Sequence, residues 1–259
     1  MSDNILVELQ DGVATVVLNR PLKRNAVSLA MWRDIERAFA DLKKNPDVRV
    51  VILTGAGGNF CAGADISEFA EVRADAESGR AYEAATEAAT IAIRDLPQPT
   101  IAAVSGYGVG GGCGLALACD FRVGDPTSRM GIPAARLSII YSPLDCSLLY
   151  RAVGLANAKR ILFTGRFFPL AECISMGLID SAHEADAMIG AREMAQEFKA
   201  NAPLTLRGSK LVLEALNANV LKEKEHDIHA IIDTALGSAD YREGARAFLE
   251  KRSPVFVGR

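Results

Sequence analysis

The chain has 259 residues, of which 49% are hydrophobic and 24% are charged, and its formal net charge is −3. This length fits one large domain or one domain with a small appendage, and no basic stripe marks a nucleic-acid-binding face. The five cysteines are widely spaced and form no CxxC pair, which disfavours disulfides and metal sites. No apolar run is long enough to span a bilayer, and the opening residues lack the pattern of a secretory signal, so we expect a cytoplasmic protein.

Strand and helix signals alternate through the first half of the chain. Two short apolar runs flank Asp11-Gly12, a pattern typical of a β-hairpin over 5–9 and 13–18. The apolar spacing predicts a helix over 28–45, and a β-branched run predicts a strand over 48–54. The elements expected next are a loop turning into a helix over 59–69, a helix over 81–96, a strand over 101–105, a short helix ending at 118, and short strands over 121–123 and 130–132.

From residue 143 onward the sequence predicts helix almost everywhere. The expected helices cover residues 144–153, 156–163, 170–176, 186–201, 204–216 and 221–252. No low-complexity tract or polar linker separates the two parts of the chain. The fold class predicted is therefore α/β, with a helical C-terminal third.

The most informative segment is the glycine cluster at 110–112, which follows a short apolar strand and opens a helix of small residues. Consecutive glycines let backbone N–H groups approach a ligand, and a helix start adds unpaired amides and a positive dipole end. A second glycine turn, Ala-Gly-Ala-Asp at 62–65, has the same placement between a strand and a helix. Two converging amides are what a thioester carbonyl needs when it becomes an enolate, so the turns predict a paired-donor site.

The glycines are compatible with two other interpretations. Gly106, Gly108 and Gly111 also match the GxGxxG pattern of dinucleotide-binding folds, with Asp125 as the ribose-binding acid. Asp125, however, lies too few residues after the glycines for a ribose-binding acid, and the helix after the turn is only about two turns long. Either turn taken alone is also explained by tight packing of a helix on a strand.

Several ordered segments make the chain resemble the crotonase superfamily, the enoyl-CoA hydratases and isomerases, over almost its full length. The matching segments are residues 19–21 with 25–26, 50–55, 59–66, 101–104 with the following glycines, 119–120, 162–165, and 243–244 with 247–252. The resemblance implies a β-β-α superhelical core that binds acyl-CoA, over 1–200, and a helical trimerisation region over 201–259. It also implies a homotrimer or a dimer of trimers, and no cofactor, since the CoA thioester is itself the substrate.

The same resemblance places the oxyanion donors at the backbone N–H groups of Ala64 and Gly111. It implies that residues 62–66 lie along the CoA, while Arg24 either contacts the CoA phosphates or is a solvated loop arginine. The residues expected to bind the substrate are Arg24, Ala26, Ala62, Gly63, Ala64, Asp65, Ile66, Tyr107, Gly110, Gly111 and Ser142. Asp65 is also expected to cap the helix that it precedes.

The two glutamates with which hydratases of this superfamily add water are absent. Their positions hold Gly114 and Ala134, and a positioned acid or base contributes about 10²–10⁴-fold to a rate. Hydration should therefore be strongly suppressed. Isomerases of the superfamily often carry one carboxylate further on, at a position that aligns with Ser142.

Residues 141–145, Tyr-Ser-Pro-Leu-Asp, have the pattern of a helix start, with Ser142 and Asp145 as a capping pair. Capping alone explains both residues. The stretch that ends at Tyr141 is similar to methylmalonyl-CoA decarboxylases, although those enzymes carry a histidine at the position of Ala64. Asp145 is the best remaining candidate for an acid or base. The predicted catalytic set is therefore Ala64, Gly111, Tyr141 and Asp145.

These observations favour an acyl-CoA enzyme that works through a thioester enolate, as a decarboxylase or an isomerase. The alternatives are an enoyl-CoA hydratase with displaced acid and base residues, and a non-catalytic acyl-CoA-binding homologue. Glu68, Glu83 and Glu87 are further carboxylates on helices whose facing the sequence does not fix. RNA binding, which occurs in rare members of the superfamily, is disfavoured by the acidic charge balance.

Overall fold

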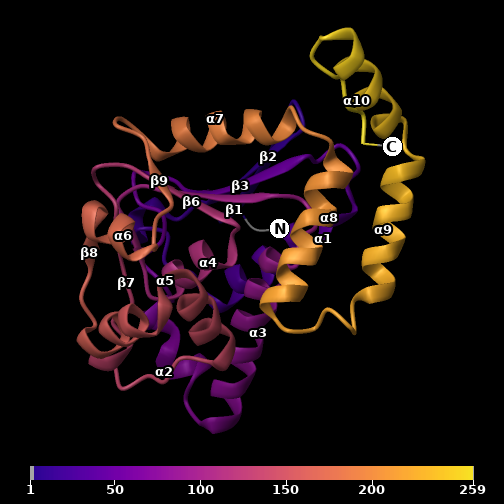
Figure 1. Cartoon of the computed structure of the whole chain (residues 1–259). Helices are drawn as coiled ribbons and strands as arrows, with labels where there is room; N and C mark the ends of the chain where they lie inside the picture. Colours follow the sequence, from indigo (N-terminus) through magenta and orange to yellow (C-terminus); the bar gives the residue numbers. More distant parts are fainter. Residues whose placement is uncertain (1–2, 259) are drawn as a thin grey trace.

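A computed structural model describes residues 3–258, and its strands form two sheets (Figure 1). The larger sheet has, in spatial order, strands β1 (Ile5–Gln10), β2 (Val13–Leu18), β3 (Val50–Gly55), β4 (Thr100–Val104), β6 (Phe121–Gly124) and β9 (Ser181–Ala182). The predicted hairpin is confirmed, because β1 and β2 pair antiparallel, whereas the pairs from β2 onward are parallel. The smaller sheet contains β5 (Tyr107–Val109), β7 (Arg129–Gly131) and β8 (Phe168–Pro169).

Ten α-helices are found among the described residues. They are α1 (Leu29–Lys44), α2 (Phe69–Val72), α3 (Ala76–Arg94), α4 (Gly111–Ala118), α5 (Pro143–Thr164), α6 (Leu170–Met176), α7 (Ala187–Lys199), α8 (Pro203–Asn217), α9 (Glu225–Gly237) and α10 (Ala239–Glu250). The predicted α/β class with a helical C-terminal third is confirmed. No helix in the described part of the chain is long and apolar enough to cross a bilayer.

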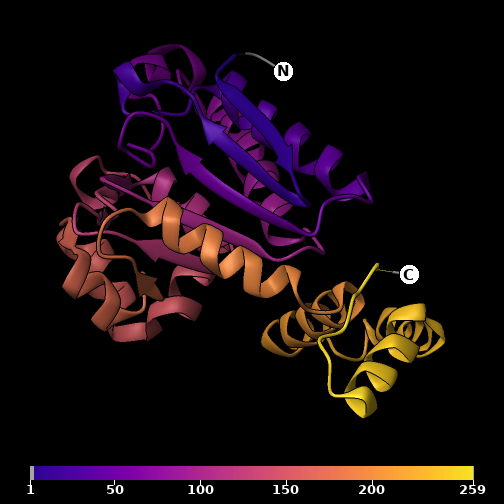
Figure 2. The same cartoon turned by 90° about the horizontal axis from the view of Figure 1, so that it is seen from above.

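Both faces of the larger sheet are covered, which explains the uninterrupted apolar sequence of its central strands. Val51 and Leu53 of β3 belong to the core formed with α1, α3 and α4, while Val50 and Ile52 belong to a second core on the opposite face. Helix α7 lies along that opposite face (Figure 2). It packs there through three buried alanines, Ala187, Ala191 and Ala195.

Three predicted boundaries differ from the structure for local reasons. Helix α3 begins five residues before the predicted start, because Asp75 and Ser78 form a capping box there. The expected single helix over 221–252 is wrong, since Ser238 is extended (φ −72°, ψ 157°) and caps α10 by accepting the Tyr241 N–H. The two helices predicted over 144–163 meet at a kink within α5, where Gly154 has φ 72°.

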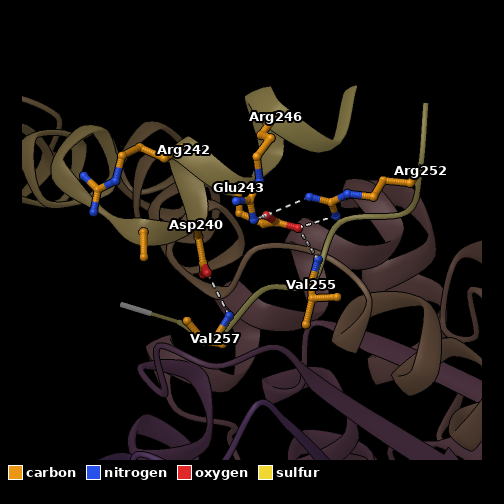
Figure 3. Close-up of a pocket in the computed structure, with 8 residues that line it drawn as sticks. Asp240, Arg242, Glu243, Arg246, Arg252, Val255 and Val257 are labelled. Atoms are coloured by element: carbon orange, nitrogen blue, oxygen red, sulfur yellow. Dashed lines mark hydrogen bonds and ion pairs between the residues drawn. The ribbon is translucent and has the colours of Figure 1, made fainter. Parts of the chain in front are cut away.

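Helices α8, α9 and α10 lie beyond one end of the larger sheet (Figures 1 and 2). The C-terminal segment turns back along α10, where the Asp240 carboxylate accepts the Val257 N–H at 2.7 Å (Figure 3). The same carboxylate accepts the Gly258 N–H, also at 2.7 Å. Arg49, at the entry to β3, donates to the carbonyl oxygens of Phe256 (3.3 Å) and Asn201 (3.1 Å). These contacts tie the helical part to the sheet, and the expected boundary between 200 and 201 falls in the α7–α8 loop.

Candidate active site

The two glycine turns of the sequence lie side by side in the structure. The Cys61 N–H donates to the Tyr107 carbonyl at 2.7 Å, and the Val109 N–H donates to the Cys61 carbonyl at 2.9 Å. A Cβ on Gly63 (φ 93°) would lie 2.8 Å from the Val109 oxygen and 3.3 Å from the Gly111 nitrogen. Only glycine allows this close approach, which explains the residue type at position 63.

The backbone amides of Ala64 and Gly111 are free and close to each other. Ala64 bridges Val27, but the bridging hydrogen bonds use the Gly63 carbonyl and the Asp65 N–H, and Gly111 is the first residue of α4. Neither amide donates to an acceptor within residues 3–258, and a Cβ on Gly111 would lie 3.6 Å from the Ala64 nitrogen. Both residues line one cavity of about 410 Å³. Two free N–H groups at one cavity can bind an oxygen that gains negative charge.

Three other predicted site residues line the same cavity, Tyr141, Ser142 and Asp145, at the start of α5. Ser142 caps this helix by accepting the Asp145 N–H, which confirms its predicted capping role, whereas the Asp145 carboxylate accepts the Ser142 hydroxyl and not the Ser142 N–H. The Tyr141 hydroxyl lies 3.8 Å from the place a Cβ on Gly110 would take. Burial raises the pKa of Tyr141 well above its ordinary value, which keeps the hydroxyl protonated and able to donate.

The Asp145 carboxylate lies next to the empty side-chain position of Gly114. Its Oδ1 is 3.5 Å from the point where a Cβ on Gly114 would stand, and its Oδ2 accepts the Ser142 hydroxyl at 3.2 Å. Burial raises the pKa of Asp145, the hydrogen bond from Ser142 lowers it, and the negative charge of Glu87 raises it; the net shift is upward. A partly buried carboxylate from α5 therefore stands near the place where α4 carries no side chain.

The remaining expected binding residues do not line this cavity. They are Arg24, Ala26, Ala62, Gly63, Asp65, Ile66, Tyr107 and Gly110. The Arg24 guanidinium lies over the Tyr107 ring, 5.3 Å from its centroid, and the Arg24 carbonyl accepts the Ala62 N–H at 2.9 Å. The structure thus gathers Arg24, Ala62 and Tyr107 into one group beside the glycine turns, and their role in binding stays a prediction.

Asp65 is held by protein groups. Its carboxylate pairs with Arg20 (3.0 Å) and Lys23 (2.9 Å) and accepts the Ser67 N–H, which caps the short 3-10 helix that follows. Burial by itself would raise the pKa of Asp65, but the hydrogen bonds from Ser67, Lys23 and Arg20 hold it well below the ordinary value. The capping role is confirmed, and the ion pairs fix the turn that carries Ala64.

Asp65→Asn should lower the free energy of unfolding at neutral pH by about 2–3 kcal/mol, because it removes hydrogen bonds to a charged group. The depressed pKa stabilises the fold above the unfolded-state pKa, and this stabilisation is lost as pH falls through the folded-state pKa. Urea unfolding of both proteins at neutral pH and in strong acid measures the difference. A difference that stays the same in acid would contradict the ionic role of Asp65.

One wall of the cavity combines residues that sequence reasoning missed or could not orient. Trp32 of α1 donates its indole N–H to the Tyr82 hydroxyl at 2.9 Å, and both residues line the cavity. Glu83 and Glu87 also face it, whereas Glu68 accepts the Leu29 N–H at the start of α1. The signal that could have found this wall is the i, i+3, i+4, i+7 spacing of polar residues in the alanine-rich sequence of α3.

Comparisons with known proteins identify the family to which the chain belongs. The family model described as enoyl-CoA hydratase/isomerase matches residues 8–259. A putative enoyl-CoA hydratase/isomerase of Bacillus subtilis is 35% identical, with 100% of each chain covered, and a putative enoyl-CoA hydratase of Thermus thermophilus is 37% identical, covering 97% of this chain and 100% of the relative. A solved structure of a putative enoyl-CoA hydratase/isomerase family protein from Hyphomonas neptunium aligns with a TM-score of 0.93 at 36% identity, over 99% of this chain and 98% of that chain. The two-sheet α/β fold is thus of the crotonase type, and the chain belongs to the enoyl-CoA hydratase/isomerase family.

Proposed function

We propose that this chain binds an acyl-CoA thioester and stabilises its enolate with the amides of Ala64 and Gly111. The pair of free N–H groups beside one cavity is the observation that carries this proposal. Each such donor is worth about 3–4 kcal/mol in a transition state that develops charge on oxygen. Because the donors are backbone groups fixed by the β5–loop pairing, they need no reorganisation during the reaction.

The reaction that fits best is movement of a double bond from the 3,4 to the 2,3 position of the acyl chain. In this reaction one base removes a proton from C2, the electrons form a dienolate, and the same group returns a proton at C4. Asp145 suits this role, because its raised pKa makes it a stronger base than an exposed aspartate. Tyr141 supplies a hydroxyl that can hold the substrate near the amide pair.

The other reactions of the family fit the cavity less well. Decarboxylation needs a substrate carboxylate in the cavity, where the carboxylates of Asp145 and Glu87 would repel it. Hydration needs two carboxylates around one water, and Gly114 and Ala134 provide neither. A hydratase with displaced residues is the second candidate, because Glu87 faces the same cavity as Asp145.

The test offers the purified protein 3-enoyl-CoA, crotonyl-CoA and methylmalonyl-CoA in parallel. We expect conversion of 3-enoyl-CoA to the 2-enoyl isomer to exceed hydration and decarboxylation, because one carboxylate and two amides suffice for it. Chromatography of the CoA esters separates the three products. Hydration of crotonyl-CoA as the fastest reaction would favour the second candidate, and tight binding without any turnover would favour a non-catalytic acyl-CoA-binding protein.

We also propose that the helical C-terminal part assembles the chain into a homotrimer or a dimer of trimers. Large apolar side chains on α8 and α10 support this assignment, since Leu213, Phe248 and Leu249 are 63%, 83% and 81% exposed. An apolar groove between α8 and α9, lined by Val212, Ile231 and other residues, adds to the surface. Sedimentation equilibrium measures the assembly, and a monomer would contradict it.

A further inference from the structure

The cavity wall formed by α3 is polar along its whole length. Glu83, Thr86, Glu87 and Thr90 are spaced i, i+3, i+4 and i+7, so they share one face of the helix, and all of them line the cavity. The facing wall, from residues 139–143, is mostly apolar. A site for a plain alkyl chain would be apolar on all sides, so the α3 wall indicates that the acyl group carries a polar substituent.

The four residues Glu83, Thr86, Glu87 and Thr90 of the α3 wall present hydrogen-bond acceptors to the cavity. The Thr86 hydroxyl donates to the Glu83 carbonyl at 2.8 Å, and the Thr90 hydroxyl donates to the Thr86 carbonyl at 3.0 Å. Each hydroxyl proton is used within the helix, and only the oxygen lone pairs face outward. The Glu87 carboxylate is an acceptor as well. A group that pairs with this wall must therefore supply the donors itself.

The charged residues that line the cavity determine which kind of hydrogen-bond donor it favours. Among residues 3–258, Arg73 is the one cation that lines it, and Arg73 is already paired with Glu83 at 3.1 Å. The carboxylates of Glu87 and Asp145 form no ion pair with a described residue. The aromatic rings of Phe69 and Tyr82 complete this side, and Arg73 itself lies over both, 5.1 Å and 5.4 Å from their centroids. Because Arg73 already covers both rings, the carboxylates of Glu87 and Asp145 are the groups that favour a cation.

We propose that the acyl group of the substrate carries a positively charged nitrogen, which the Glu87 carboxylate and the α3 hydroxyl oxygens bind. This inference rests on the proposed function, because it assigns the chain of the same thioester whose carbonyl meets Ala64 and Gly111. A protonated amine supplies donors to the acceptor wall and neutralises Glu87. An acyl group that ends in a carboxylate or in a plain alkyl group neither supplies donors nor neutralises Glu87.

The test measures binding with pairs of saturated CoA esters that differ only in a terminal methyl or ammonium group. The pairs are β-alanyl-CoA with butanoyl-CoA, and 6-aminohexanoyl-CoA with heptanoyl-CoA; succinyl-CoA is the anionic ester. We expect the amine of at least one pair to bind about fivefold or more tightly than its methyl partner, and succinyl-CoA to bind most weakly. Isothermal titration calorimetry gives each dissociation constant without turnover.

Variants of α3 test which residues cause the preference for the amine. Glu87→Gln, which keeps the shape and removes the charge, should abolish the preference for the amine, and Thr86→Val should reduce it. Glu77→Gln on the exposed first turn of the same helix is the matched control and should keep it, because Glu77 does not line the cavity. Equal binding within each pair would overturn the inference and leave the proposed function intact. Absence of binding for every ester would overturn the proposed function itself.

Discussion

Gly111→Pro should lower kcat/KM for the 3-enoyl-CoA substrate about 10²–10³-fold below the value of Gly111→Ala, which is the expected loss for one oxyanion donor. Proline has no N–H, and its Cδ occupies the place of the amide hydrogen, so the variant removes the donor and keeps the substrate oxygen away from this nitrogen. Position 111 is the first residue of α4, where proline fits a helix because no intrahelical bond is lost.

The alanine variant is the control for the added side-chain carbon. A Cβ on Gly111 would lie 3.1 Å from two atoms of the Trp32 ring, and both variants introduce this contact. Only the proline variant also replaces the N–H by Cδ, so the ratio of the two rates measures the loss of oxygen binding at this amide. Circular dichroism and thermal unfolding show whether both variants remain folded. Equal rates for folded alanine and proline variants would contradict an oxyanion role for this amide.

The features that the sequence predicted depend on short-range chemistry. The hairpin follows from Asp11-Gly12, the start of α5 from Ser142 and its proline, and the buried strand β3 from a β-branched run. The glycine turns could also be predicted from the sequence, because only glycine tolerates φ 93° at Gly63 next to the Val109 carbonyl. Each of these signals lies within a few residues of the structure that it specifies.

The features that were missed depend on contacts between segments that are distant in sequence. The proximity of Asp145 to the Gly114 position requires α4 and α5 to pack, and no spacing within either helix reveals it. Strands β8 and β9 have two residues each, so they have no periodicity to detect. The spacing of polar residues in α3 marks one face of that helix, but it does not show that this face lines a cavity formed with α1, α5 and the glycine turns.

Asp145→Asn should lower kcat for isomerisation by about 10²–10⁴-fold, the contribution of a positioned acid or base. The amide has the shape of the carboxylate and can still accept the Ser142 hydroxyl, but it cannot take a proton from C2. In the parent protein the rate should rise with pH through the pKa of Asp145, which burial places above the ordinary value of 3.8. The variant should lose this rise, and a pH profile of kcat measures it.

The stability of Asp145→Asn should rise while its rate falls. This difference separates a catalytic role of Asp145 from a structural one. A carboxyl group whose pKa is raised in the folded state favours folding below the unfolded-state pKa, and this contribution is lost as pH rises through the folded-state pKa. At neutral pH the buried charge of Asp145 therefore disfavours the fold, and Asp145→Asn should raise the Tm there, with a smaller gain in acid. Ser142→Ala is the matched variant, because it removes the cap and the hydrogen bond but keeps the carboxylate; it should lower the Tm and retain most of the rate. A loss of Tm in Asp145→Asn that parallels its loss of rate would mean that Asp145 supports the start of α5 and carries no proton.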